Sequence, residues 1–157
     1  MSKTRHKEIE RKFLVRGEPW QGMGGTLIRQ AYLMRSEEKI LRIRQKGNDF
    51  YLTLKIGAGM TRFEFEQKID DIQGEALLNL HALETPIQKM RYAIKHGAHI
   101  WDVDVFYAEN SGLVMAEIEL ESEEEAFELP EWAAVEVTGD DRFQNSYLAQ
   151  KAFKNWQ

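Results

Sequence analysis

Lys7-Glu8-Ile9-Glu10-Arg11-Lys12-Phe13-Leu14-Val15 is the stretch on which the fold of this 157-residue chain depends. At the two-residue period of a β-strand, the charged residues Glu8, Glu10 and Lys12 share one face. The opposite face is largely apolar and carries Ile9, Arg11 and Phe13. Taken alone, this pattern is typical of a half-buried strand whose apolar side faces the core and whose charged side faces water.

The same alternation recurs along the chain, and this recurrence changes the interpretation. Several segments carry paired charges of one sign on one face and apolar residues on the other. These segments are Leu41-Arg42-Ile43-Arg44, Phe63-Glu64-Phe65-Glu66, Lys89-Met90-Arg91-Tyr92, Trp101-Asp102-Val103-Asp104-Val105 and Ala116-Glu117-Ile118-Glu119-Leu120-Glu121. Leu52-Thr53-Leu54-Lys55 adds a single lysine in the same alternation.

Composition limits the class of protein. A chain of 157 residues with 43% hydrophobic and 30% charged residues predicts one globular domain over residues 1–157. No apolar run approaches the length of a membrane span, and no signal peptide is recognisable, so we expect no membrane association. The absence of cysteine excludes thiolate chemistry and fits a cytoplasmic location. The net charge of −5 argues against a nucleic-acid binder.

The chain is predicted to contain eight or nine strands, mostly in antiparallel hairpins, and two or three helices. We expect the strands over residues 7–15, 27–34, 39–46, 50–56, 62–69, 87–95, 99–107, 113–121 and 133–138, separated by glycine-rich turns such as 47–49 and 57–59. The period changes to a helical one over residues 74–83 and 140–155. A capping-box pattern of Ser122 and Glu125 predicts a short helix over 122–127.

An antiparallel sheet of this size is expected to close into a barrel, because closure removes its edges. Either the apolar face fills the barrel, or the charged face lines a hollow and the apolar face points outward. The predicted helices carry apolar stripes, which only an apolar outer barrel face could cover. In addition, like-charged pairs such as Arg42 and Arg44 are best explained by a tunnel whose contents bring countercharge. We therefore expect the charges to point inward.

The ordered set of charged motifs resembles the CYTH family, the triphosphate tunnel metalloenzymes. In chain order the motifs are Glu8-x-Glu10-x-Lys12 with Phe13-Leu14-Val15, Arg29-Gln30-Ala31-Tyr32-Leu33, Leu41-Arg42-Ile43-Arg44, Leu54-Lys55, Glu64-Phe65-Glu66, Lys89-Met90-Arg91-Tyr92, Asp104-Val105-Phe106, Glu117-Ile118-Glu119 and Glu136-Val137-Thr138-Gly139-Asp140. The chain departs from the family at Ala31, Phe143 and Asp141. Because Asp141 stands near a position that is basic in some members, Lys151 is an alternative for the C-terminal phosphate contact.

The resemblance implies an α+β fold: an eight-stranded antiparallel β-barrel with a charged interior and helices packed on the outside. A small-molecule triphosphate would lie in this tunnel, held by basic residues, which are Lys12, Arg42, Arg44, Lys55, Lys89 and Arg91. Oxygen ligands suited to Mg²⁺ or Mn²⁺ would be Glu8, Glu10, Glu64, Glu66, Asp104, Glu117 and Glu119. Catalytic roles would fall to Glu8 and Glu10 near the attacking water, and to Tyr32 in proton transfer.

Four functions remain open at this level. The resemblance favours metal-dependent hydrolysis of inorganic tripolyphosphate to pyrophosphate and phosphate, with thiamine triphosphatase and class IV adenylyl cyclase as alternatives. A binding module of another class would capture polyphosphate or a nucleotide without turnover. Family members can be dimers, so a homodimer is also open. Asp102 is a further candidate to bind the metal or to support the residues that bind it, while Glu121 and Glu136 could equally be ion-pair partners.

Overall fold

The computed structural model describes residues 3–58 and 60–156, with side chains from residue 7 onward. Nine strands form one sheet in the described residues. They are β1 (Lys3–Val15), β2 (Thr26–Arg35), β3 (Lys39–Lys46), β4 (Asp49–Ile56), β5 (Thr61–Ile69), β6 (Ile87–His96), β7 (His99–Phe106), β8 (Val114–Glu119) and β9 (Ala133–Glu136). The helices are α1 (Asp71–Leu80) and α2 (Asn145–Gln150), with short 3₁₀ turns at Ala108–Asn110, Asp141–Phe143 and Phe153–Asn155.

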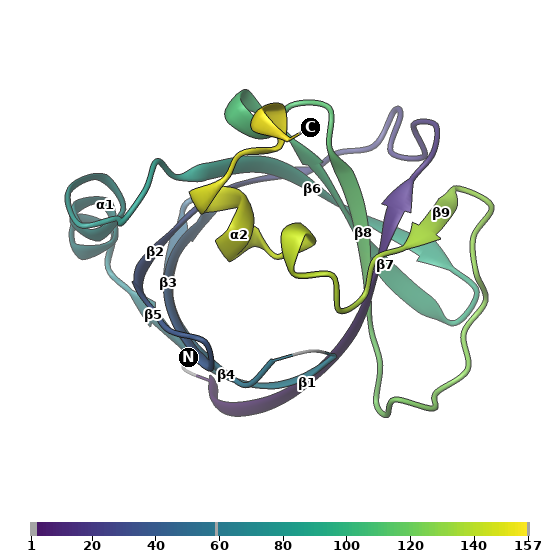
Figure 1. Ribbon diagram of the computed structural model, residues 1–157, viewed down its shortest axis with the longest axis horizontal. Coiled ribbons are helices and arrows are strands. Elements are labelled where there is room, and N and C mark those ends of the chain that lie inside the picture. The colour runs from purple at the N-terminus through teal and green to yellow at the C-terminus, as the bar shows by residue number, and fades with distance from the viewer. Residues whose placement is uncertain (1–2, 59, 157) are drawn as a thin grey trace.

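Eight of the strands close into an antiparallel barrel, which Figure 1 shows as a ring. The sheet order is β5-β4-β3-β2-β6-β7-β8-β1-β9, and a further pairing of β5 with β1 closes the ring. The long strand β1 makes this possible, because its first half pairs with β5 and its second half with β8. Strand β9 is an addition at the end of β1, where Phe13 pairs with Glu136 and Val15 with Ala133. The predicted eight-stranded barrel is confirmed.

Tight turns connect the hairpins as the sequence predicts. Gly47 follows β3 with a φ of 61°, and Gly97 joins β6 to β7 with a φ of 62°. These are left-handed conformations, which glycine adopts without a steric penalty. The turn predicted at residues 57–59 includes Gly59, which lies outside the described residues.

Helix α1 covers one part of the apolar outer face. Its Leu78 is fully buried against Ala31, Ile43 and Phe50. Gly74 allows this close approach, because a Cβ atom at that position would overlap the Phe50 ring. The helix begins three residues earlier than the predicted 74–83, because the Asp70 side chain caps it by accepting a hydrogen bond from the Gln73 N–H (2.8 Å).

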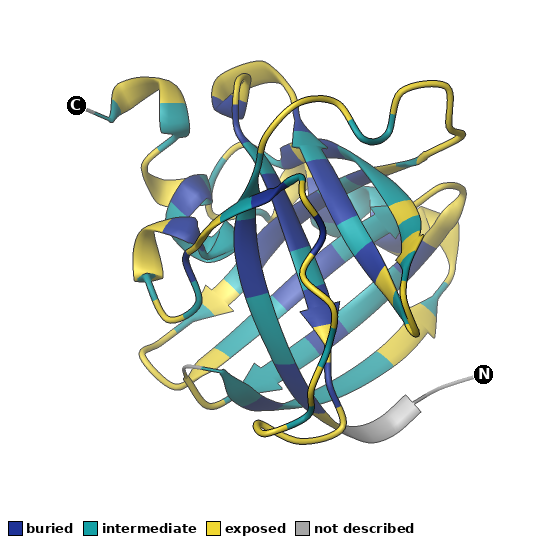
Figure 2. Cartoon of the chain, turned by 90° about the vertical axis from the view of Figure 1, so that its right-hand side faces the viewer, coloured by how far each residue is buried: buried dark blue, intermediate teal, exposed yellow. Residues whose placement is uncertain are grey.

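Loops cover another part of the apolar outer face. Ile9, Phe13, Trp101, Val103 and Ile118 form a buried cluster on the outside of β1, β7 and β8. It lies beneath aromatic side chains of the connecting segments, which are Trp20, Phe127 and Trp132. Figure 2 views this side and shows an exposed segment that crosses strands with many buried residues. The prediction that helices pack on the outside of the barrel is confirmed by α1, and loops share in covering the apolar face.

The helix predicted over residues 122–127 is absent, so that prediction was wrong. Residues 121–122 form a bend and residues 123–124 a turn, and the Glu125 N–H donates a hydrogen bond to the Ser122 carbonyl oxygen (3.2 Å). The Glu125 carboxylate accepts a hydrogen bond from the Glu121 N–H (2.5 Å) and also contacts His99 Nε2 (2.5 Å). The contact between Glu125 and His99 of β7 keeps this segment out of a helical conformation. A local capping pattern could not reveal it.

The terminal helix predicted over residues 140–155 is also wrong, since three short pieces replace it. The reason is tertiary packing. The rings of Phe143 and Trp156 have centroids 5.3 Å apart. In a continuous helix, a rise of about 1.5 Å per residue would separate these positions by roughly 20 Å. Folding the segment back instead buries Phe143 and Leu148 in one cluster with Tyr32.

Candidate active site

A polar cavity of about 350 Å³ lies inside the barrel. The predicted charged face points into it, so the choice of the charged interior is confirmed. The predicted site residues that line it are Glu8, Glu10, Lys12, Tyr32, Arg42, Arg44, Lys55, Glu64, Lys89, Arg91, Glu117 and Glu119. Asp104 and Glu66 do not line the cavity. Asp102, left open by the sequence, does line it.

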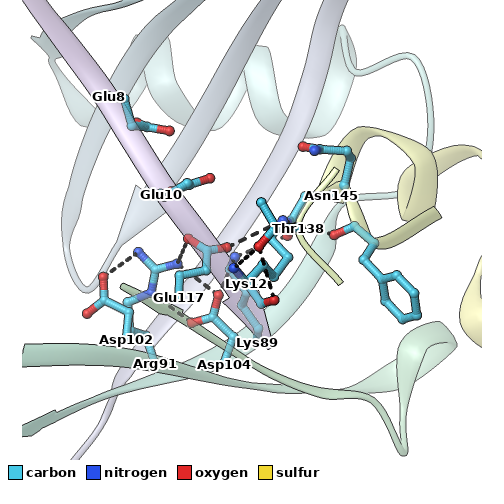
Figure 3. Close-up of polar contacts among 12 residues, drawn as sticks. Glu8, Glu10, Lys12, Lys89, Arg91, Asp102, Asp104, Glu117, Thr138 and Asn145 are labelled. Atoms are coloured by element: carbon cyan, nitrogen blue, oxygen red, sulfur yellow. Dashed lines mark hydrogen bonds and ion pairs between the residues drawn. The ribbon is translucent and has the colours of Figure 1, made fainter. Parts of the chain in front are cut away.

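Asp104 lies directly behind two of the cations. It is 1% exposed, and its carboxylate accepts two hydrogen bonds from the Arg91 guanidinium, from Nε at 2.7 Å and from Nη2 at 2.8 Å. Lys89 Nζ lies 2.8 Å from the same carboxylate. Burial works to raise the pKa of Asp104, but Arg91 and Lys89 outweigh it and hold that pKa below its ordinary value. Asp104 therefore orients Lys89 and Arg91 toward the cavity (Figure 3).

Glu117 faces the same group of cations from β8. Its carboxylate lies 3.7 Å from Lys12 Nζ and 4.0 Å from Arg91 Nη2. Burial favours a higher pKa, yet Lys12, Arg91 and Lys89 together hold the pKa of Glu117 well below its usual range. Figure 3 shows these side chains converging from β1, β6 and β8, with Glu8 and Glu10 farther along β1.

Glu8 and Glu10 form a second charged group with cations from β4 and β5. Glu8 Oε1 lies 3.1 Å from Lys55 Nζ and 3.4 Å from Arg62 Nη2. Glu10 Oε1 is 2.8 Å from the same Arg62 nitrogen. Burial, reinforced by the negative charge of Glu117, raises the pKa of Glu10 to about 7. The carboxylates of Glu8, Glu10 and Glu117 therefore repel one another, and additional positive charge near them would stabilise their ionised forms.

The third group consists of arginines on β3. Arg42 donates to Thr53 Oγ1 (3.3 Å), but its buried Nε has no hydrogen-bond partner. Arg44 Nε donates weakly to Gln30 Oε1 (3.3 Å). Burial and then the repulsion from Arg42 lower the pKa of Arg44 to about 9. A buried guanidinium with an unused donor and a like-charged neighbour is suited to receive an anion.

Tyr32 projects toward these arginines from β2. It is 4% exposed, and its hydroxyl oxygen accepts a hydrogen bond from Gln30 Nε2 (3.2 Å). Burial raises the pKa of Tyr32, although Arg42 opposes the shift. The phenol is therefore protonated at neutral pH and available as a donor. Glu66 instead accepts a hydrogen bond from Thr53 Oγ1 (3.3 Å), away from the cavity lining.

The C-terminal segment, residues 140–156, covers one end of the barrel, as Figure 1 shows for α2. Three cations of the cavity donate to three consecutive residues of this segment. Lys12 Nζ donates to the Phe143 carbonyl oxygen (3.0 Å), Arg62 Nη1 to Gln144 Oε1 (3.3 Å) and Lys89 Nζ to Asn145 Oδ1 (3.1 Å). At the far end of the cavity, Ile100 is 63% exposed and the Asp102 side chain 44%. Lys151 is exposed and lies outside the cavity lining.

Sequence reasoning missed several residues of the cavity, of which Arg62 is the most important. Arg62 is two residues before Glu64 on β5, so the alternation that selected Glu64 and Glu66 would also have selected it. Gln144, Asn145 and Ser146 also line the cavity, but no sequence pattern marks them. Their position depends on the folding back of the C-terminal segment.

Two acidic residues left open by the sequence lie elsewhere. Glu136 accepts two hydrogen bonds from Arg11 on the outside of the barrel, at 2.8 and 2.6 Å. It is therefore an ion-pair partner rather than a member of the cavity. Glu121 is exposed in the turn after β8, with its backbone N–H bonded to Glu125.

The model of the CYTH domain matches residues 6–147 of this chain, which includes eight of the nine strands in full and most of β1. The chain belongs to the CYTH family. A family member from Acetivibrio thermocellus, named an inorganic triphosphatase, is 39% identical over 153 residues, covering 96% of this chain and 98% of its own. A second inorganic triphosphatase, from Nitrosomonas europaea, is 40% identical over 147 residues, covering 90% and 96%.

A solved structure supports the same assignment. The crystal structure of an inorganic triphosphatase matches this chain with a TM-score of 0.67 and 36% identity, over 90% of this chain and 96% of that one. In the described residues, no helix is both long enough and apolar enough to cross a membrane.

The residues of the cavity fit a hard divalent cation by their chemistry. Every anionic group that lines the cavity is a carboxylate, and oxygen is the donor that Mg²⁺ and Mn²⁺ prefer. The negative charges of Glu117 and Glu8 contribute to the raised pKa of Glu10, and a cation between such groups would relieve this repulsion. Among the described residues, no three acidic or histidine side chains stand in an arrangement that could hold a metal ion. The carboxylates of Glu8 and Glu10 form ion pairs with Lys55 and Arg62, respectively.

Proposed function

We propose that the protein is a divalent-metal-dependent triphosphatase that hydrolyses inorganic tripolyphosphate to pyrophosphate and phosphate. The observation that carries this proposal is the set of cations inside the closed barrel, with an unpartnered Nε on Arg42 and a carboxylate group alongside. The two inorganic triphosphatases of the same family support the choice of substrate. The expected homodimer and cytoplasmic location stay predictions.

The basic residues of the cavity would bind and orient the phosphate chain. Guanidinium groups match phosphate oxygens in a bidentate geometry, which suits Arg42, Arg44 and Arg91. Lys12, Lys55 and Lys89 would neutralise charge as compact ammonium groups. An incoming anion would replace protein contacts that are long in this structure, such as the 3.3 Å bond from Arg44 to Gln30. Because these groups are already positioned, little reorganisation would be needed during phosphoryl transfer.

The carboxylates and Tyr32 would act on the reacting groups. Glu8, Glu10, Glu64, Glu117 and Glu119, which line the cavity, would supply ligands to Mg²⁺ or Mn²⁺. Asp104 and Glu66 lie outside the lining, where Asp104 would hold Lys89 and Arg91 in place and Glu66 accepts a hydrogen bond from Thr53. Such an ion, when bound, polarises phosphate oxygens and lowers the pKa of an attacking water. Tyr32, which burial keeps protonated, would donate its phenolic proton toward the departing phosphate oxygen.

The first experiment is phosphate release from inorganic tripolyphosphate, thiamine triphosphate and ATP, each with Mg²⁺ or Mn²⁺ and with or without chelator. The expected result is chelator-sensitive phosphate release that is much faster from tripolyphosphate than from the others. Faster turnover of thiamine triphosphate would select that alternative. Cyclic AMP and pyrophosphate from ATP would indicate a cyclase. Tight tripolyphosphate binding without any turnover would overturn the enzymatic proposal in favour of a binding module.

The metal assignment has its own test in Glu8→Gln and Glu10→Gln. Each change replaces a carboxylate by a neutral amide of similar size, so we expect turnover to be abolished while tripolyphosphate still binds. Glu136→Gln is the matched control, because Glu136 lies on the outside of the barrel with Arg11. Full activity in either cavity variant would show that the residue is not required as a metal ligand.

A further inference from the structure

Arg62 is a buried cation of the barrel interior to which the family motifs quoted above assign no role. It lies on β5 and is 8% exposed. Its guanidinium contacts acceptors on two sides. Nη2 donates to Glu10 at 2.8 Å and to Glu8 at 3.4 Å, while Nη1 donates to Gln144 Oε1 at 3.3 Å. Arg62 therefore joins the carboxylates of β1 to the C-terminal segment.

The position of Arg62 is also a boundary between two cavities. A second cavity of about 540 Å³ lies outside the barrel end, between the β2–β3 and β4–β5 turns and the C-terminal segment. Four residues line both this outer cavity and the tunnel, which are Ile40, Arg62, Gln144 and Ser146. Arg62 is the only charged residue among these four, so a phosphate chain that reaches this end of the tunnel meets its guanidinium.

The donors of Arg62 are incompletely used. Its Nε is buried and has no hydrogen-bond partner, and the bonds to Glu8 and Gln144 are long. An unpaired buried donor on a charged group is costly. Among these contacts, the 2.8 Å bond to Glu10 is the short one. A phosphate oxygen beside Arg62 would supply the acceptor that Nε lacks.

The partners of Arg62 are the same carboxylates that would hold a divalent cation. Glu8 also receives Lys55 at 3.1 Å, whereas for Glu10 the structure records an ion pair with Arg62. A guanidinium and a divalent cation cannot both neutralise Glu10 fully. Binding of the cation would therefore weaken the hold of Glu10 on Arg62 and leave the guanidinium available to an anion.

We propose that Arg62 is a substrate-binding residue that neutralises Glu8 and Glu10 in the metal-free protein and contacts the terminal phosphate at the outer-cavity end once a divalent cation has taken those carboxylates. The inference deepens the proposed triphosphatase function and rests on it. Metal binding and substrate binding would then be coupled, because a divalent cation on Glu8 and Glu10 would leave Arg62 free to contact the substrate.

The test compares Arg62→Gln with wild type in two measurements that should change in opposite directions. Calorimetric titration with Mn²⁺ alone, without substrate, should show binding at least about fivefold tighter in Arg62→Gln, because a competing cation has been removed. The KM for tripolyphosphate at saturating Mg²⁺ should rise at least about tenfold, because a charge-assisted contact to phosphate has been lost.

Arg11→Gln is the matched control. Arg11 also pairs with a glutamate of the barrel, but on its outer face, where it bonds Glu136. This variant loses the same charge and should change neither the Mn²⁺ affinity nor the KM. An unchanged KM in Arg62→Gln would overturn the phosphate contact, and an unchanged or weaker Mn²⁺ affinity would overturn the exchange of partners.

Arg62→Lys covers the case in which Arg62→Gln does not fold. It keeps the positive charge but loses the planar group that contacts Glu10 and Gln144 together, so the KM should still rise about threefold or more. Wild-type values for both measurements in this variant would overturn the proposal. If wild type itself releases no phosphate from tripolyphosphate, the proposed function fails. The inference is then decided by the Mn²⁺ titration and by calorimetric binding of tripolyphosphate.

Discussion

Leu148→Ala tests whether the C-terminal segment folds as part of the barrel. Leu148 is 1% exposed and packs at the covered end of the barrel with Tyr32, Ile87 and Phe143. The change removes three buried carbon atoms, which contribute about 2.4 kcal/mol at about 0.8 kcal/mol each. The cavity left behind adds to this loss, so we expect the free energy of unfolding to fall by about 3–4 kcal/mol.

The assay is urea unfolding followed by tryptophan fluorescence and far-ultraviolet circular dichroism. In thermal unfolding of a chain of this length, the expected loss corresponds to a Tm about 6–16 °C lower. Leu80→Ala is the control, because Leu80 is 74% exposed on α1 and should change stability by less than about 0.5 kcal/mol. A loss below about 1 kcal/mol in Leu148→Ala would refute the reasoning. It would mean that the segment detaches without unfolding the barrel.

The remaining predictions concern a close contact, a pH dependence and a trade-off. Gly74→Ala should lower the Tm despite the better helix propensity of alanine, because the new Cβ would overlap Phe50; a raised Tm would contradict this. The hydrogen bonds from Arg11 hold the pKa of Glu136 below its ordinary value, so the pair stabilises the fold above the unfolded pKa of about 4.3 and loses that contribution as the pH falls further. Thermal unfolding from about pH 3 to 7 should therefore show that the Tm difference between wild type and Glu136→Gln becomes smaller only below about pH 4. A Tm difference that stays constant over this range would contradict a stabilising ion pair between Arg11 and Glu136. Arg44→Ala should raise the Tm of the ligand-free protein, because a base whose pKa falls to about 9 on folding opposes folding, and it should raise the KM for tripolyphosphate; a lower Tm would contradict the first expectation.

Much of the site was predictable because a strand imposes a strict alternation. Once Glu8, Glu10 and Lys12 are placed on one face, the pairings of β1 with β5 and β8 bring Glu64 and Glu117 to the same side. The same rule would have included Arg62, which was overlooked although it shares the face of Glu64. Asp104 and Glu66 obey the alternation, yet they lie outside the cavity lining, because alternation gives the face of a residue and not its depth.

Predictions failed where contacts with distant strands override a local helical pattern. The capping pattern at Ser122 and Glu125 is a local signal, and the contact of Glu125 with His99 on β7 overrides it. The apolar residues after Asp140 fit a helical period, but burying both Phe143 and Trp156 against the barrel end requires the segment to turn back. In both cases a contact with a distant strand outweighs a local propensity.

The sequence by itself determined the barrel and its charged interior, because a two-residue period repeated over several strands leaves few ways to bury the apolar face. The tertiary structure alone decided how the tunnel ends. Gln144 and Asn145 reach Arg62 and Lys89 only because Leu148 and its apolar neighbours pack against the end of the barrel. Such a contact joins residues 56 or more positions apart in the chain, at a separation where no local pattern carries information.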